Sequence, residues 1–120
     1  MIGPNPKQFY IVGSFRSLTL INNISKKLEN MGLIRTYDWS KATQHPDLEQ
    51  LHDIAEHEYQ GLINCDFLVF IFPGGKGANI AFGIATALHK RIYLFDTTGK
   101  TDDPEETSSF YLMAHVTRFH

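Results

Sequence analysis

Two glycine-rich segments in the sequence offer backbone groups that could bind a ligand. Gly13-Ser14-Phe15-Arg16 follows the apolar run 9–12, and Gly74-Gly75-Lys76-Gly77 follows the apolar run 67–72. Glycine lets the backbone approach a ligand closely, and a helix that follows presents free N–H groups to an anion. Neither segment matches a P-loop or a G-x-G-x-x-G motif. We therefore expect a ligand site here, with a plain structural turn as the alternative for each segment.

Charged and aromatic side chains near these segments extend the candidate site. Arg16 and Lys76 could face a phosphate group, although lone loop cations are commonly solvated. Asp38 and Trp39 follow a second apolar run, where the indole could stack on a base and the carboxylate could accept hydrogen bonds from ribose or base. Core packing of Trp39 is the alternative.

Metal chemistry has no support in the pattern of ligating residues. His52 and Glu56 are spaced four apart on a predicted helix, but the H-E-x-x-H motif is missing and no third ligand has a recognisable spacing. The acidic segment 102–106 reads as a solvent-exposed loop. We expect no metal and no cofactor.

Strands and helices are predicted to alternate along the chain. Val, Ile and aromatic runs predict the strands and a 3.6-residue apolar period predicts the helices. The expected strands are 9–12, 33–37, 67–72, 92–95 and 116–119, and the expected helices are 18–31, 47–64 and 78–89. This order predicts an α/β fold with an open, doubly wound, mostly parallel sheet of about five strands in three α/β/α layers, in which ligands bind at the carboxyl ends of the strands. Gly83 suggests that the third helix packs closely on this sheet.

Composition limits the classes of protein to consider. The 120 residues, 42% of them apolar, suffice for one domain over 1–120 but not for two. A net charge of -2 argues against binding to a nucleic-acid polymer. The single cysteine, Cys65, cannot form an intrachain disulfide. Residues 1–7 contain no apolar run and no segment is long enough to span a membrane, so we expect a cytoplasmic protein.

Seven short motifs occur together in an order and spacing that is more specific than any one of them. They are 9–15 (FYIVGSF), 36–39 (TYDW), Glu58, 65–66 (CD), 73–77 (PGGKG), 83–85 (GIA) and 107–111 (TSSFY). Over almost the whole chain this set resembles the nucleoside 2-deoxyribosyltransferases and related small bacterial proteins. The resemblance implies a flavodoxin-like, Rossmann-like sheet, a homodimer or higher homo-oligomer with shared sites, and a nucleoside, nucleotide or NAD-like ligand.

The resemblance also assigns roles to individual residues. The family uses a glutamate two residues before the glycine that corresponds to Gly83, where this chain has Ala81. That glutamate attacks the anomeric carbon of the sugar, and an alanine methyl cannot. Glu58 matches an acidic position that could orient the sugar or protonate the leaving base, with a solvated helix carboxylate as the alternative. The remaining residues expected to bind substrate are Asn79 and, from a neighbouring subunit, Ser108, Ser109 and Tyr111.

Several functions therefore stay open at this stage. The leading one is an N-glycosidase or deoxyribosyltransferase that Ala81 makes inactive but that still binds ligand, with Ala81 interpreted as an engineered replacement. Alternatively, Ala81 is native and the protein senses or sequesters a nucleotide without cleaving it. A third possibility is a TIR-like enzyme that cleaves NAD or cyclic ADP-ribose. The sequence does not choose between hydrolysis and transfer, or between nucleosides and 5′-monophosphates.

Overall fold

The central sheet has five parallel strands in the order β2-β1-β3-β4-β5. The computed structural model describes residues 7–120, so the N-terminal residues used to argue for cytoplasmic localisation lie largely outside the described part. The strands are β1 (Gln8–Val12), β2 (Ile34–Arg35), β3 (Phe67–Phe72), β4 (Arg91–Asp96) and β5 (Val116–Phe119). The expected five-strand parallel sheet is confirmed. The second strand is shorter than the expected 33–37.

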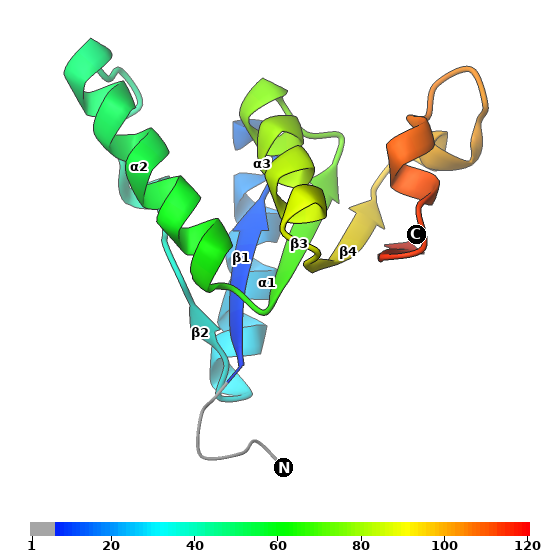
Figure 1. Cartoon of the computed structure of the whole chain (residues 1–120), viewed down its shortest axis with the longest axis horizontal. Coiled ribbons are helices and arrows are strands. Elements are labelled where there is room, and N and C mark those ends of the chain that lie inside the picture. The colour runs from blue at the N-terminus through cyan, green and yellow to red at the C-terminus, as the bar shows by residue number, and fades with distance from the viewer. Residues whose placement is uncertain (1–6) are drawn as a thin grey trace.

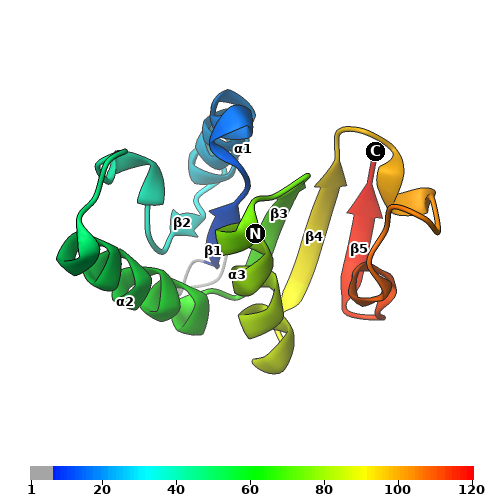
Figure 2. The ribbon, with the colours of Figure 1, turned by 90° about the horizontal axis from the view of Figure 1, so that it is seen from above.

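Helices cover both faces of the sheet, which confirms the doubly wound three-layer fold. α1 (Leu18–Asn30) lies on one face, and α2 (Leu48–Asn64) and α3 (Lys76–Ala87) lie on the other (Figures 1 and 2). Short 3₁₀ helices fill the connections: η1 (Phe15–Ser17), η2 (Trp39–Lys41), η3 (Lys100–Asp102) and η4 (Ser109–Leu112). α3 begins two residues earlier than expected, at Lys76, because Gly75 takes an extended conformation and serves as its N-cap.

The two central strands form the core. Phe9, Tyr10 and Ile11 of β1 are completely buried. Leu68, Phe70 and Ile71 of β3 are completely buried as well, and Val69 between them is 2% exposed. A strand covered by helices on both faces is apolar at every position, and this is why the run 67–72 could be recognised as a central strand.

Close packing of α2 on the sheet depends on Gly61. A Cβ atom at this residue would lie 3.1 Å from the Thr36 hydroxyl oxygen and 3.2 Å from Tyr37 Cβ. The Thr36 hydroxyl donates a hydrogen bond of 2.9 Å to the Gly61 carbonyl. The expected role of Gly83 is wrong: a Cβ there would meet nothing within 4 Å, because this side of α3 faces open space and not the sheet.

The start of α2 is defined by a capping box. The Asp47 side chain accepts from the Gln50 amide, and the Gln50 side chain accepts from the Asp47 amide. The predicted apolar stripe forms on this helix, but it is only partly covered: Leu62 is buried, whereas Leu48 is 84% exposed and Leu51 is 48% exposed.

None of the helices within residues 7–120 is both long enough and apolar enough to cross a membrane.

Candidate functional site

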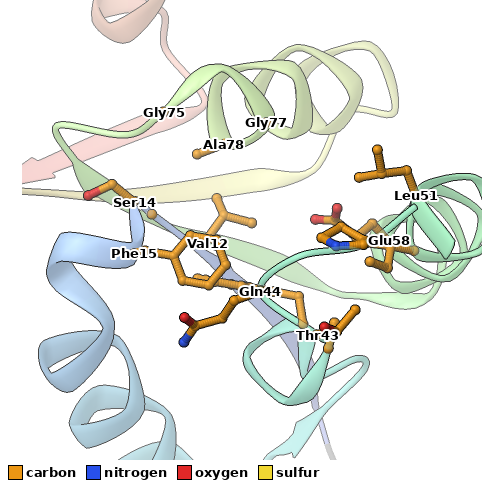
Figure 3. A pocket seen from close by; sticks show the side chains of 15 residues that line it. Val12, Ser14, Phe15, Thr43, Gln44, Leu51, Glu58, Gly75, Gly77 and Ala78 are labelled. Carbon is orange, nitrogen blue, oxygen red and sulfur yellow. The ribbon is translucent and has the colours of Figure 1, made fainter. Parts of the chain in front are cut away.

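A cavity of about 360 Å³ lies at the carboxyl edge of the sheet, beside the ends of β1 and β3. Because these strands are parallel neighbours, the loops that follow them emerge side by side. Figure 3 shows the cavity with Val12 at the end of β1, Ser14 and Phe15 from the segment that follows, Ala78 from α3, and Leu51 and Glu58 from α2. Its walls are mostly apolar with a few polar groups, as in small-molecule sites. The full set of lining residues is Val12, Gly13, Ser14, Phe15, Trp39, Ala42, Thr43, Gln44, Pro46, Leu51, Ile54, Glu58, Gly75, Gly77 and Ala78.

Seven of the residues expected from the sequence line this cavity and nine do not. Those that line it are Gly13, Ser14, Phe15, Trp39, Glu58, Gly75 and Gly77. Those outside the lining are Arg16, Asp38, Gly74, Lys76, Asn79, Ala81, Ser108, Ser109 and Tyr111. The structure therefore brings together both glycine-rich loops, the indole and the carboxylate. The two cations expected near a phosphate, Arg16 and Lys76, are exposed and lie outside the wall.

The glycines of the two loops serve different purposes. A Cβ at Gly13 would come within 2.7 Å of Ile21 Cδ1, and one at Gly74 within 2.8 Å of Ala78 Cβ, so both are required for packing within the protein. A Cβ at Gly75 or Gly77 would meet nothing within 4 Å. Only this second pair keeps space open at the cavity, and it does so at the start of α3, where backbone N–H groups lack partners within the helix.

An aromatic corner closes one side of the cavity. The Trp39 ring is 9% exposed and meets Phe15 edge-on, with ring centroids 5.3 Å apart. Trp39 Nε1 donates a hydrogen bond of 2.7 Å to the carbonyl of Ile11 in β1. Core packing and a contribution to the cavity were treated as alternatives for Trp39, but the structure combines them. The hydrogen bond fixes the orientation of the indole that a ligand would meet.

Asp38 stabilises the turn that carries Trp39 and does not face the cavity. Its Oδ1 accepts from the Ser40 amide at 3.0 Å and from the Ser40 hydroxyl, and it lies 3.2 Å from Nη2 of Arg35. The Arg35 side chain is only 6% exposed. Burial lowers the pKa of Arg35, and the nearby Asp38 carboxylate opposes this effect. Asp38 is therefore a capping residue for η2, and its expected contact with a ligand remains a prediction.

Glu58 supplies the only ionisable side chain among the described residues that line the cavity. It is held by Tyr10 of β1, whose hydroxyl donates to Glu58 Oε1 at 2.5 Å. Burial, followed by the proximity of the Glu58 carboxylate, raises the pKa of Tyr10 above its ordinary value. With one carboxylate and no second ionisable side chain in the wall, the site as described offers binding and a single acid–base group.

The segment after β4 contacts the second glycine-rich loop within the same chain. The Tyr111 hydroxyl bonds to Asn79 Oδ1, and Asn79 Nδ2 donates to the carbonyls of Gly74 at 3.3 Å and Gly75 at 3.0 Å. Tyr111 is buried among Phe70, Phe72 and Phe82. Tyr111 and Asn79 thus hold the second glycine-rich loop in place through these hydrogen bonds.

Ser108 and Ser109 border two other hollows. Ser108 lines a hollow of about 370 Å³ with Asn79, Gly83 and Tyr111, and Ser109 lines one of about 440 Å³ with Thr101 and Arg118. Neither serine reaches the main cavity of its own chain. Their expected role in the site of a neighbouring subunit remains a prediction.

Ala81 is buried on α3 and does not itself line the cavity. It is 3% exposed on α3, one turn after Ala78, which does line the cavity. Side chains in a helix lean toward its N-terminus, so a longer side chain at position 81 would extend toward Gly77 and Ala78. The structure is therefore compatible with the role that the sequence resemblance gives to this position.

Sequence reasoning missed the floor formed by the segment 42–46 and the start of α2. Six residues that line the cavity were not among those expected to bind a ligand: Ala42, Thr43, Gln44, Pro46, Leu51 and Ile54. The one available signal was position: this segment follows a strand that neighbours β1, on the edge of the sheet where ligands bind. Among residues 7–120 no three His, Cys, Asp or Glu side chains are grouped so that they could hold a metal ion.

The chain has a fold of the doubly wound α/β class, with a cavity at the carboxyl edge of its sheet. Solved structures share this fold. A CMP N-glycosidase from Clostridium botulinum aligns with a TM-score of 0.67 and 16% identity, over 94% of this chain and 88% of that chain. A 2-deoxyribosyltransferase from Bacillus psychrosaccharolyticus aligns with a TM-score of 0.74 and 15% identity, over 94% and 85%. A 2-deoxyribosyltransferase from Leishmania mexicana aligns with a TM-score of 0.57 and 17% identity, over 77% and 65%.

The sequence itself matches no protein-family model and no curated protein. At identities of 15–17% the structural likeness establishes the fold. It agrees with the resemblance found from the ordered motifs, since all three structures are of an N-glycosidase or of 2-deoxyribosyltransferases.

Proposed function

We propose that the chain binds a nucleoside or nucleotide in the cavity beside the ends of β1 and β3. The observation that carries this proposal is the arrangement of the cavity wall, in which the Trp39–Phe15 corner and Glu58 face the open glycines Gly75 and Gly77. An aromatic corner suits a base, a carboxylate suits sugar hydroxyl or base N–H groups, and open glycines with a helix N-terminus suit a ribose or phosphate. The shared fold with a CMP N-glycosidase and 2-deoxyribosyltransferases supports the same ligand class.

We propose further that the chain belongs functionally with N-glycosidases and deoxyribosyltransferases but holds its ligand without cleaving it. Cleavage in this class needs a carboxylate below the anomeric carbon, and position 81 holds a methyl group. Ground-state affinity comes from stacking, sugar contacts and backbone N–H groups, which Ala81 leaves in place. Whether a restored enzyme would transfer or hydrolyse depends on which acceptor enters the site.

Calorimetry tests the binding proposal. Cytidine, CMP, 2′-deoxycytidine and dCMP are titrated into the protein, and each ligand is recovered intact afterwards by chromatography. Trp39→Ala should weaken binding by about fivefold to tenfold, because a stacking face is worth on the order of 1 kcal/mol. Trp39→Phe retains a ring and is the matched control, with a smaller loss. If none of the four ligands binds, or if Trp39→Ala binds as tightly as the parent, the cavity is not a nucleoside site.

We also propose that the working form is a cytoplasmic homodimer or higher homo-oligomer. Three large apolar side chains on helices are more than half exposed: Leu48 is 84% exposed on α2, Ile80 is 62% exposed on α3, and Phe110 is 61% exposed on η4. α2 and α3 lie on the same face of the sheet (Figure 2). A second copy packed against this face would remove such side chains from water.

A further inference from the structure

The two oxygens of Glu58 have different surroundings. Oε1 accepts the hydrogen bond from Tyr10 at 2.5 Å, and no hydrogen bond within residues 7–120 reaches Oε2. Glu58 lines the cavity, whereas Tyr10 is completely buried in β1 and does not. One oxygen is therefore tied to the protein core, and the other remains available to a ligand.

The backbone fixes this geometry. Gly61, one turn after Glu58, allows α2 to approach so closely that a Cβ at position 61 would lie 3.5 Å from Tyr10 Cδ1. The Tyr10 ring stands in the fully buried part of β1, between β2 and β3. Because the helix and the ring are both held by packing, the hydroxyl and the carboxylate keep their relative position with or without a ligand.

Tyr10 can act only as a donor in this pair. A carboxylate has no proton to give, and burial, followed by the nearby Glu58 carboxylate, raises the pKa of the Tyr10 hydroxyl above its ordinary value, which favours the protonated donor. The direction of the hydrogen bond is thus set by the buried partner. Within residues 7–120 the Tyr10 hydroxyl has no hydrogen-bond acceptor other than Glu58. A replacement at position 58 that offered this hydroxyl only a donor would leave the buried O–H without an acceptor, which is costly. We therefore expect any replacement to turn an acceptor toward Tyr10 and its second polar atom toward the cavity.

We infer that Tyr10 is a positioning residue that makes Glu58 a directed hydrogen-bond acceptor, so that the cavity selects ligands that present an amino or hydroxyl donor to Oε2. This inference rests on the proposed function and adds the polarity of ligand recognition. A donor can come from a base, as the amino group of cytosine, or from the sugar, as the 2′-hydroxyl. A ligand that offers only an acceptor at this point leaves two acceptors facing each other, which is unfavourable.

Replacement of Glu58 by glutamine should change which kind of hydrogen-bonding group faces the ligand. Glutamine has nearly the same shape as glutamate but one acceptor and one donor. Since Tyr10 requires an acceptor, the amide oxygen should pair with Tyr10 and the amide NH₂ should face the cavity. Glu58→Gln should therefore reverse the polarity that the ligand meets. In the double variant Tyr10→Phe/Glu58→Gln nothing orients the amide, and the reversal should disappear.

The experiment compares ligand pairs that differ by one donor. Affinities of cytidine, uridine and 2′-deoxycytidine are measured by calorimetry for the parent, Glu58→Gln, Tyr10→Phe, the double variant and Tyr93→Phe. Tyr93→Phe removes a hydroxyl from a tyrosine that does not line the cavity and is the matched control. The cytidine-to-uridine ratio reports a donor on the base, and the ratio of cytidine to 2′-deoxycytidine reports a donor on the sugar.

The parent and Tyr93→Phe should prefer the donor-bearing ligand of one pair by about tenfold or more, the size expected for a hydrogen bond to a charged group. Tyr10→Phe should lower that ratio severalfold. Glu58→Gln should invert a base preference, or abolish a sugar preference because a hydroxyl also accepts, and the double variant should show a ratio near one.

A merely structural role of Tyr10 would weaken all ligands equally and leave the ratios unchanged, which would overturn the inference. It would also be overturned if Glu58→Gln kept the preference of the parent, or if the parent bound all three nucleosides equally. If the parent bound none of them, the proposed function would fail and the inference with it.

Discussion

If the proposed function holds, a carboxylate introduced at position 81 should make the chain cleave the ligand that it binds. Ala81 is 3% exposed on the face of α3 that Ala78 presents to the cavity one turn earlier. Glutamate adds four heavy atoms, and because helix side chains lean toward the N-terminus, these atoms extend toward the cavity between Gly77 and Ala78. There the carboxylate would stand opposite Glu58, giving the two acidic groups that retaining glycosidic chemistry requires.

The substitution should change two quantities, the rate of base release and the free energy of unfolding. A covalent nucleophile is worth at least ~10³-fold in rate, or about 4 kcal/mol of barrier. The larger side chain in a nearly buried site should cost roughly 1–3 kcal/mol of folding free energy through overpacking. The variant should therefore be less stable than the parent but remain folded, and it should release free base.

Ala81→Gln is the matched control, because it carries the same volume and lacks the nucleophile. Base release from 2′-deoxycytidine, dCMP, CMP and NAD is followed by chromatography in both variants, and unfolding is followed by circular dichroism. We expect the initial rate of Ala81→Glu to exceed that of Ala81→Gln by at least ~10³-fold on one substrate. If Ala81→Glu is folded, binds ligand like the parent and releases no more base than Ala81→Gln, the assignment of position 81 is wrong.

Two further predictions concern assembly and stability. Light scattering at micromolar concentration should report a dimer or larger oligomer. The double variant Leu48→Asp/Ile80→Asp should be a monomer, whereas Met31→Asp at the end of α1, on the other face of the sheet, should not change the oligomeric state. A stable monomeric parent would refute the shared site. Burial alone would raise the pKa of Asp96, but hydrogen bonds from Thr101 and Thr98 outweigh it and hold the pKa below its ordinary value. Stability from Asp96 is thus present above the unfolded pKa of about 4 and lost as the pH falls below it. Denaturation by urea should show Asp96→Asn less stable than the parent by about 1–3 kcal/mol at pH 7, with the difference shrinking below about pH 4; a difference independent of pH would contradict this account.

The alternation of strands and helices was readable from the sequence because it depends on local patterns. The run 67–72 is apolar at every position, as a central parallel strand must be, and the helical spacing of apolar residues predicted the helix 47–64 that the structure has as α2. The loops after the first and third strands were located for the same reason. Once these strands are parallel neighbours, their following loops must meet at one edge of the sheet.

Tertiary packing decided what each residue in those loops does. Residue type alone does not distinguish the role of Gly13 from that of Gly75. A Cβ at Gly13 would clash with Ile21, whereas the missing side chain of Gly75 keeps space open at the cavity. Residue type also could not show that Asp38 faces Arg35, or that Tyr10 faces Glu58 across 48 positions of sequence. Local spacing specifies strands, helices and turns because these depend on neighbouring residues. The direction in which a side chain points depends on distant elements packed against it, and only the folded chain brings those elements together.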